Sequence, residues 1–200
     1  VIQAQDLDGE AVRAALDRIE AESLAAAARA SADGAGEADF RAMSPADLAD
    51  WIESRHHGPL REVMAEVGEL IPRLLAAHGA NHPELFRVHR VFNALRTELE
   101  QHLVREEEIL FPAWQTPRPG RPVPAEDPAL RALSDELRRE HEAAGALLRD
   151  LREAAGGYKV PDDGCSTYRR TYRLLDAMEA DLHQHIHLEN NILFPPPGGT

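Results

Sequence analysis

Apolar residues recur at alternating intervals of four and three positions along two long stretches of the chain, residues 84–111 and 166–193. The first series is Val88, Phe92, Leu95, Leu99, His102, Glu106 and Ile109, and the second is Thr171, Leu175, Met178, Leu182, His185, Glu189 and Ile192. Residues at this spacing share one face of an α-helix, and such a stripe is typical of helices that pack together. Both stretches are therefore predicted to be helices whose core face carries polar side chains near its end.

Two further helices are predicted, and short or proline-rich connections separate all four, with residues 115–128 forming the longest of these. The four predicted helices span about residues 44–77, 83–111, 129–155 and 166–193. Residues 1–30 predict an additional helix and residues 31–43 a linker. The chain is therefore expected to be all-α, with an antiparallel up-down-up-down four-helix bundle as its main fold.

Composition narrows the possible functions. The 200 residues have a formal net charge of −13, which argues against the basic surface that nucleic-acid binding requires. No run of 18 apolar residues predicts a membrane span, and no signal peptide is recognisable. The single cysteine, Cys165, cannot form an intrachain disulfide. These features together predict a cytoplasmic protein that binds neither nucleic acid nor membranes.

One segment of the chain occurs twice, at residues 102–112 and 185–195. In each copy a histidine is followed four residues later by a glutamate, just before an apolar run that ends in proline. His102 and Glu106 therefore share one helix face, as do His185 and Glu189, and both pairs fall on the core stripe. Burying an unpaired charge destabilises a protein by several kcal/mol, because the charge loses its interactions with water. A hydrogen-bonded pair that fixes helix register would explain one copy, but two copies at the same position of the stripe favour a metal site.

The remaining ligands are expected on the other two helices. His57 precedes His102 by 45 residues, and His141 precedes His185 by 44, so the whole half-site is repeated. The predicted ligand set is His57, His102, Glu106, His141, His185 and Glu189. Two metal ions, each with two histidines, and two bridging glutamates account for this set. The mixture of imidazole and carboxylate suits iron or manganese better than a bridged zinc pair.

Other histidines are weaker candidates. His56 competes with His57, which is preferred because it begins the apolar stripe of the first helix, predicted to be Leu60, Met64, Val67, Ile71 and Leu74. His78 falls on the same stripe but lies roughly 31 Å farther along a continuous helix, at about 1.5 Å per residue. His183 and His187 flank His185 and are expected to be solvated or to contact ligands from outside. Glu107, Glu108 and Glu140 are expected to be exposed, with Glu107 or Glu140 as the alternative lining of an access path.

Several segments resemble one known family. They are His57 and residues 78–85, 88–112, 139–145, 165–168 and 181–195. Together they are similar to the RIC (repair of iron centres) family, a hemerythrin-like branch of di-iron proteins. The resemblance implies two non-haem iron ions with an oxo or hydroxo bridge, held in part by bridging Glu106 and Glu189. It also implies a role in restoring iron–sulfur clusters damaged by nitric oxide or oxidants.

The N-terminal part departs from this family. RIC proteins commonly begin with a small helical domain that holds a Cys-Cys pair, whereas residues 1–22 resemble only the last helix of that domain. We therefore expect residues 1–43 to be a remnant that lacks the cysteine pair and residues 44–197 to be the hemerythrin-like bundle. Any function of that pair is in doubt for this chain.

Three functions remain open at this point. The first is repair of iron–sulfur clusters by iron donation or by binding and reduction of nitric oxide, with damaged iron–sulfur proteins and the diatomics NO and O2 as partners. The second is a hemerythrin-like carrier or sensor of oxygen or nitric oxide. The third is a structural bundle without metal. Whether the protein is an enzyme is left open, since the sequence has no recognisable catalytic triad or nucleophile, and a homodimer is also left open.

Overall fold

A computed structural model describes residues 39–115 and 126–194. The helix expected at residues 1–30 and most of the expected linker lie outside the described residues. The division of the chain at residue 43 therefore stays a prediction. The described residues from Phe40 onward form one structural unit.

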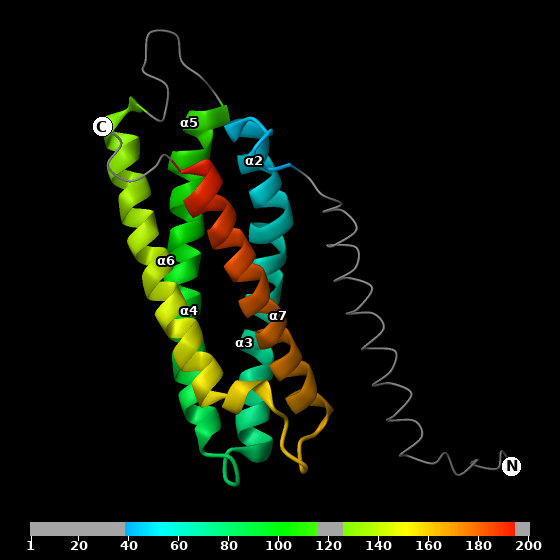
Figure 1. Cartoon of the computed structure of the whole chain (residues 1–200). Coiled ribbons are helices and arrows are strands. Elements are labelled where there is room, and N and C mark those ends of the chain that lie inside the picture. Colours follow the sequence, from blue (N-terminus) through cyan, green and yellow to red (C-terminus); the bar gives the residue numbers. More distant parts are fainter. Residues whose placement is uncertain (1–38, 116–125, 195–200) are drawn as a thin grey trace, which may run out of the picture. The chain divides into compact units, whose positions relative to one another are not determined.

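This unit consists of four long helical stretches that lie side by side (Figure 1). The first contains α2 (Pro45–Ile52), the π-helical turn η1 (Glu53–His57) and α3 (Gly58–His78). The second contains α4 (Glu84–Arg105), the π-helical turn η2 (Glu106–Leu110) and α5 (Phe111–Gln115). The third is α6 (Pro128–Ala154), which is followed by the short 3₁₀ turn η4 (Gly156–Tyr158). The fourth contains α7 (Ser166–Leu188) and the π-helical turn η5 (Glu189–Leu193).

The arrangement confirms the predicted all-α bundle. Helix α3 packs against α7 and α4, and α4 packs against α6. Within the described ranges no helix is both long enough and apolar enough to cross a membrane.

Local sequence sets the helix ends. The Ser44 hydroxyl accepts a hydrogen bond from the Asp47 amide at 3.1 Å, and Pro45 occupies the first turn of α2. The Asp127 carboxylate accepts from the Ala129 amide at 2.9 Å in the same way at the start of α6. At the end of α3, a Cβ on Gly79 would lie 2.6 Å from the Leu75 carbonyl oxygen, so only glycine fits there.

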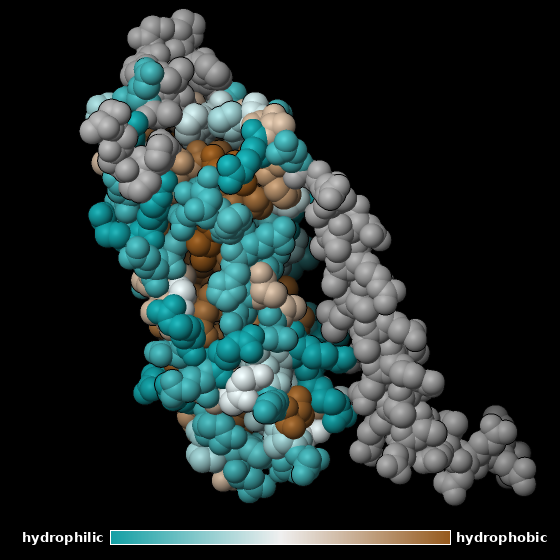
Figure 2. Space-filling model, in the orientation of Figure 1, coloured by the Kyte–Doolittle hydropathy of each residue, from teal (hydrophilic) through white to brown (hydrophobic). Residues whose placement is uncertain are grey.

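The core follows the predicted stripes. The apolar side chains of α3 that were expected to face inward are all buried: Leu60, Met64, Val67, Ile71 and Leu74. On the face seen in Figure 2, polar side chains cover the outer surfaces of the helices and apolar ones show mainly between them. Burial of these side chains at about 25 cal/mol per Å² is the main force that holds the four helices together.

The π-helical turns shift the stripes by one residue. Each is closed by an i→i+5 hydrogen bond, from the Gly58 amide to the Glu53 carbonyl, from the Phe111 amide to the Glu106 carbonyl, and from the Phe194 amide to the Glu189 carbonyl. The prediction that Ile109 faces the core is therefore wrong: its side chain is 53% exposed, whereas Leu110 is only 1% exposed. The extra residue in the turn moves the inward position from 109 to 110.

Candidate metal centre

The six predicted ligand residues meet in one layer of the bundle. His57 ends η1, Glu106 begins η2 and Glu189 begins η5, while the other three histidines lie on α4, α6 and α7. None of the six is more than 4% exposed. They form two groups in which the ligand atoms all lie within 4.8 Å of one another. One group is His57, His185, Glu106 and Glu189, and the other is His102, His141, Glu106 and Glu189.

The first group is built around two facing imidazoles. The Nε2 atoms of His57 and His185 are 3.0 Å apart. Glu189 Oε1 lies 2.9 Å from His185 Nε2, and Glu106 Oε2 lies 3.5 Å from His57 Nε2. Two nitrogens and two carboxylate oxygens thus surround a common point.

The second group repeats this geometry with the other oxygen of each glutamate. The Nε2 atoms of His102 and His141 are 2.9 Å apart. Glu106 Oε1 lies 3.2 Å from His102 Nε2, and Glu189 Oε2 lies 3.2 Å from His141 Nε2. Each glutamate therefore offers one oxygen to each pair of histidines, which is the arrangement that a bridging carboxylate requires.

The histidine pairs cross the repeat seen in the sequence. His57 and His102 belong to the first copy of the half-site, and His141 and His185 to the second. In the structure His57 is paired with His185, and His102 with His141. The reason is that α3 packs against α7 while α4 packs against α6, so each pair forms between neighbouring helices.

In three of the four histidines, the Nδ1 atom, which points away from the centre, forms a hydrogen bond with a polar side chain. His57 Nδ1 is 2.8 Å from Glu107 Oε1, and His102 Nδ1 is 2.9 Å from Glu140 Oε2. His141 Nδ1 is 2.9 Å from the Asn190 side-chain oxygen. The fourth, His185, has a buried Nδ1 without a hydrogen-bond partner in the described part of the chain.

These outer partners were not identified from the sequence. Glu107 and Glu140 were expected to be exposed or to line an access path, and Asn190 was not considered. Each of the three follows or precedes a ligand in the chain, which was the available signal. Only the packing of neighbouring helices decides which histidine each one contacts.

The hydrogen bonds fix which ring nitrogen carries the proton. Carboxylate and amide oxygens accept, so the Nδ1 atoms of His57, His102 and His141 must donate. With both rings neutral, the Nε2 atoms of His102 and His141 would present lone pairs to each other at 2.9 Å, which is repulsive unless a proton or a metal ion lies between them. All four carboxylate oxygens of Glu106 and Glu189 are buried without a hydrogen-bond partner among the described residues. The donor set therefore fits bound metal cations, with Nδ1 held from outside as in other metal sites.

The pKa shifts of the buried groups also fit a site for bound cations. Burial opposes a charge on His102, but Glu106, Glu189 and Glu140 outweigh this and raise its pKa to about 9. Burial also opposes ionisation of Glu189, yet His185, His141 and His57 hold the pKa of that carboxyl well below its usual value. The layer thus stabilises the ionised carboxylate of Glu189, which requires positive charge beside it, from protons or from metal ions.

The other histidines lie elsewhere. His56 is buried next to His57, but its Nδ1 is bound to Asp181 Oδ1 at 2.9 Å, outside both groups. His183 is exposed, and His187 is exposed and bound to Asn191. His78 belongs to a separate group at the other end of α3.

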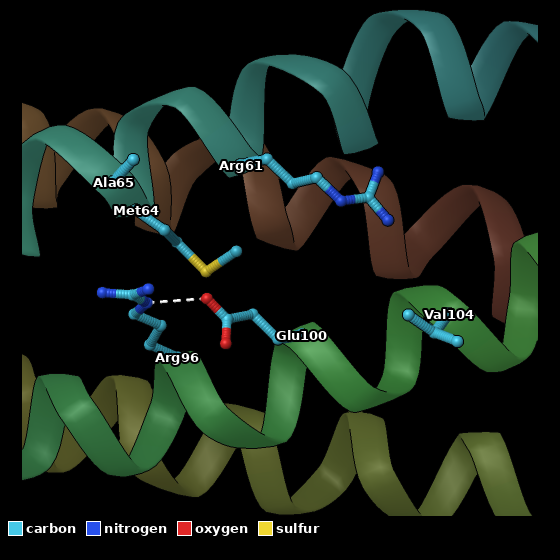
Figure 3. Close-up of a pocket in the computed structure, with 6 residues that line it drawn as sticks. All are labelled: Arg61, Met64, Ala65, Arg96, Glu100 and Val104. Atoms are coloured by element: carbon cyan, nitrogen blue, oxygen red, sulfur yellow. Dashed lines mark hydrogen bonds and ion pairs between the residues drawn. The ribbon is translucent and has the colours of Figure 1, made fainter.

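A groove runs beside the centre between α3 and α4 (Figure 3). Its volume is about 310 Å³, and it is lined by Arg61, Met64, Ala65, Arg96, Glu100 and Val104. Arg96 is paired with Glu100 inside it. Arg61 donates two hydrogen bonds, of 2.7 and 2.8 Å, to the Glu107 carboxylate that holds His57. One wall of the groove therefore reaches the outer hydrogen bonds of the centre.

Comparison with known proteins gives one family. Residues 48–196 match the Hemerythrin HHE cation binding domain. The chain is 30% identical over 159 residues to the iron-sulfur cluster repair protein ScdA of Staphylococcus haemolyticus, covering 80% of this chain and 70% of that protein. It is 33% identical over 172 residues to the iron-sulfur cluster repair protein YtfE of Pectobacterium atrosepticum, covering 77% and 71%. It is 29% identical to ScdA of Staphylococcus epidermidis, of which it spans 64%. The chain thus spans about two thirds of the length of these relatives.

Proposed function

The chain belongs to the hemerythrin HHE cation-binding family, and from this premise we propose that it is a non-haem di-iron protein that takes part in the repair of damaged iron–sulfur clusters. Two relatives from different bacteria carry the name iron-sulfur cluster repair protein, which supports this function. Iron–sulfur proteins damaged by nitrosative or oxidative stress are the proposed partners. Because the chain has a single cysteine, a reducing compartment such as the cytoplasm is the proposed location.

The proposed ligands are the six residues of the buried layer. His57 and His185 would hold one ion, His102 and His141 the other, and Glu106 and Glu189 would bridge them. The observation that carries the proposal is that each glutamate directs one oxygen to each histidine pair. Four imidazoles with two carboxylates form a mixed donor set that suits iron.

Bound iron would be able to change its oxidation state and would offer an open coordination position for a diatomic molecule. The chain's own residues would exclude bulk water and fix the ligands. Glu107 and Glu140 accept the Nδ1 protons of His57 and His102, which keeps each Nε2 lone pair directed inward. The groove that Arg61 lines is the proposed approach for nitric oxide, since Arg61 is hydrogen-bonded to Glu107, which holds His57.

The alternative is a hemerythrin-like carrier or sensor of oxygen or nitric oxide. Among the described residues, each of the two groups contains two histidines, and His56, whose Nδ1 is bound to Asp181, belongs to neither. The two metal positions therefore have equal numbers of imidazole ligands. An oxygen carrier with an asymmetric pair of ions needs a fifth histidine, so this symmetry favours the repair function.

The test begins with metal analysis and an absorption spectrum of the full chain purified after growth in iron. About two iron ions per chain are expected, and a chain without iron would support a structural bundle instead. The iron-loaded protein is then mixed with an iron–sulfur enzyme that nitric oxide has inactivated, and recovery of that enzyme's activity is measured.

The Glu106→Leu variant serves as the control for this reactivation. Recovery with the wild type but not with the variant is expected. A stable oxygen adduct after reduction and aeration, without any reactivation, would favour the carrier instead. If both proteins reactivate the enzyme equally, the proposed centre is not responsible.

A further inference from the structure

A second group of ligand-type side chains lies at the end of the bundle opposite α2 and α5 (Figure 1). It consists of His78, the last residue of α3, His82 in the turn before α4, and Asp163 in the segment before α7. One ligand atom of each lies within 4.8 Å of the others. Helix α3 is 21 residues long, so at about 1.5 Å per residue this group is roughly 30 Å from the buried centre.

His82 has the hydrogen bonds of a metal ligand. Its Nε2 lies 2.9 and 3.1 Å from the two Asp163 oxygens, and its Nδ1 lies 3.0 Å from Glu84 Oε1. A carboxylate on one ring nitrogen with the other nitrogen facing a site is the usual outer arrangement of ligating histidines. The backbone holds the residue in place, because the His82 amide donates to the His78 carbonyl at 2.8 Å.

His78 distinguishes this group from a simple ion pair. A protonated His82 between Asp163 and Glu84 would satisfy those three side chains by itself. The His78 ring, however, packs against the rings of His82 and Tyr168, with centroids 6.0 and 5.5 Å away. Neither of its ring nitrogens is hydrogen-bonded to a residue in the described ranges. A half-buried imidazole with a free nitrogen therefore faces a second imidazole and a carboxylate.

We propose that His78, His82 and Asp163 form a second metal site, separate from the buried centre, for one divalent first-row transition ion. Two imidazoles and one carboxylate suit zinc or ferrous iron, with the remaining positions taken by water, whereas magnesium and calcium prefer oxygen ligands. The ion would link the turn between α3 and α4 to the segment that precedes α7. Neither the family match nor the proposed repair function assigns this site.

The test is a titration of the iron-loaded full chain with Zn²⁺, followed with a chromophoric zinc indicator. One equivalent is expected to bind the wild type, and binding is expected to be lost in His78→Gln and in Asp163→Asn. Glu84→Gln, which removes only the outer carboxylate, should weaken binding by about 10–100-fold. His183→Gln is the matched control, because it removes an exposed imidazole that belongs to neither site and should bind zinc as the wild type does.

An anaerobic titration with Fe²⁺ in place of Zn²⁺ identifies the preferred ion, and failure of both to bind would overturn the proposal. Equal zinc binding by wild type and His78→Gln would also overturn it, since an ion pair of His82 and Asp163 needs no His78. The iron content of the buried centre is measured in the same samples, so loss of that centre is detected separately. Circular dichroism checks that each variant is folded. If one of the two ligand variants is unfolded, the other still tests the proposal.

Discussion

The two histidine groups of this bundle use the same side chains in opposite surroundings. The six residues of the buried layer are almost inaccessible to water, and three of the four helical stretches pass through it with a π-helical turn. The group of His78, His82 and Asp163 lies in the turns at the other end, where water reaches all three side chains. Water and protons can satisfy a surface group, but the charges of a buried layer need partners from within the protein.

The π-helical turns also distinguish the buried layer from the group at the other end. Such turns are rare overall, but they are frequent at functional sites, because the inserted residue changes the direction in which a side chain points. Here they occur at His57, Glu106 and Glu189, three of the six proposed ligands. Helix α3, which connects the two groups, remains α-helical over its 21 residues, with Pro72 inside it. The bundle thus departs from regular geometry where buried ligands must converge.

The largest effect is expected from removing one of the proposed bridging carboxylates. Glu106→Leu and Glu189→Leu are each expected to remove most of the bound iron, because each glutamate offers one oxygen to both histidine pairs. Metal analysis of purified protein measures this directly. Glu108→Leu is the control, since Glu108 is exposed and adjacent to the centre in sequence. Full iron retention in both bridge variants would contradict the bridging assignment.

The next largest effect concerns stability. A ligand at about 1,000 times its Kd stabilises the folded state by about 4 kcal/mol. Removal of iron should therefore lower the Tm by on the order of 10 °C in a chain of this size. Removing metal from the His78 group should lower it by no more than a few degrees at about ten times Kd. Calorimetry of the metal-free protein and of protein loaded at one site measures both shifts in Tm. The shift from the buried centre is expected to be the larger.

A smaller effect is expected from the outer hydrogen bonds of the buried layer. Glu107→Gln and Glu140→Gln keep the shape of the side chain but weaken its hold on the Nδ1 proton of His57 or His102. Loss of such a partner typically lowers metal affinity by about 10–100-fold. Competition with a chelator measures the change, and Glu108→Gln should show none. Unchanged affinity in both variants would mean that the inner ligands alone orient the rings.

The smallest effect is expected for Arg61→Ala. Arg61 acts on the centre only through Glu107, and its side chain is 41% exposed. Exposed ion pairs contribute roughly 0–1 kcal/mol, so metal affinity should fall by less than about fivefold. The same chelator competition measures it, with Arg73→Ala as the control for an exposed ion pair far from the centre. A loss larger than that of Glu107→Gln would show that Arg61 has another role.

Much of the fold could be predicted because helical periodicity is a local property. The predicted helix beginning near Ala129 and the observed α6 start within one residue of each other, and the α3 stripe is buried as expected. The error at Ile109 has a definite cause, since a repeat of four and three assumes about 3.5 residues per turn and fails where a π-helical turn inserts a residue. Nothing in the sequence stripe marks that insertion.

The amino-acid pattern alone was enough to predict an all-α bundle and to place His102, Glu106, His185 and Glu189 toward its core, because residues four apart on one helix lie on one face. It left open the choice between His56 and His57, both of which are buried. The packing of the folded chain was needed to show that His57 enters the layer, that the histidine pairs cross the repeat, and that Glu107, Glu140 and Asn190 hold the rings. Those outcomes depend on which helices are neighbours and how each is rotated, and such contacts between distant parts of the chain are set by packing rather than by local spacing.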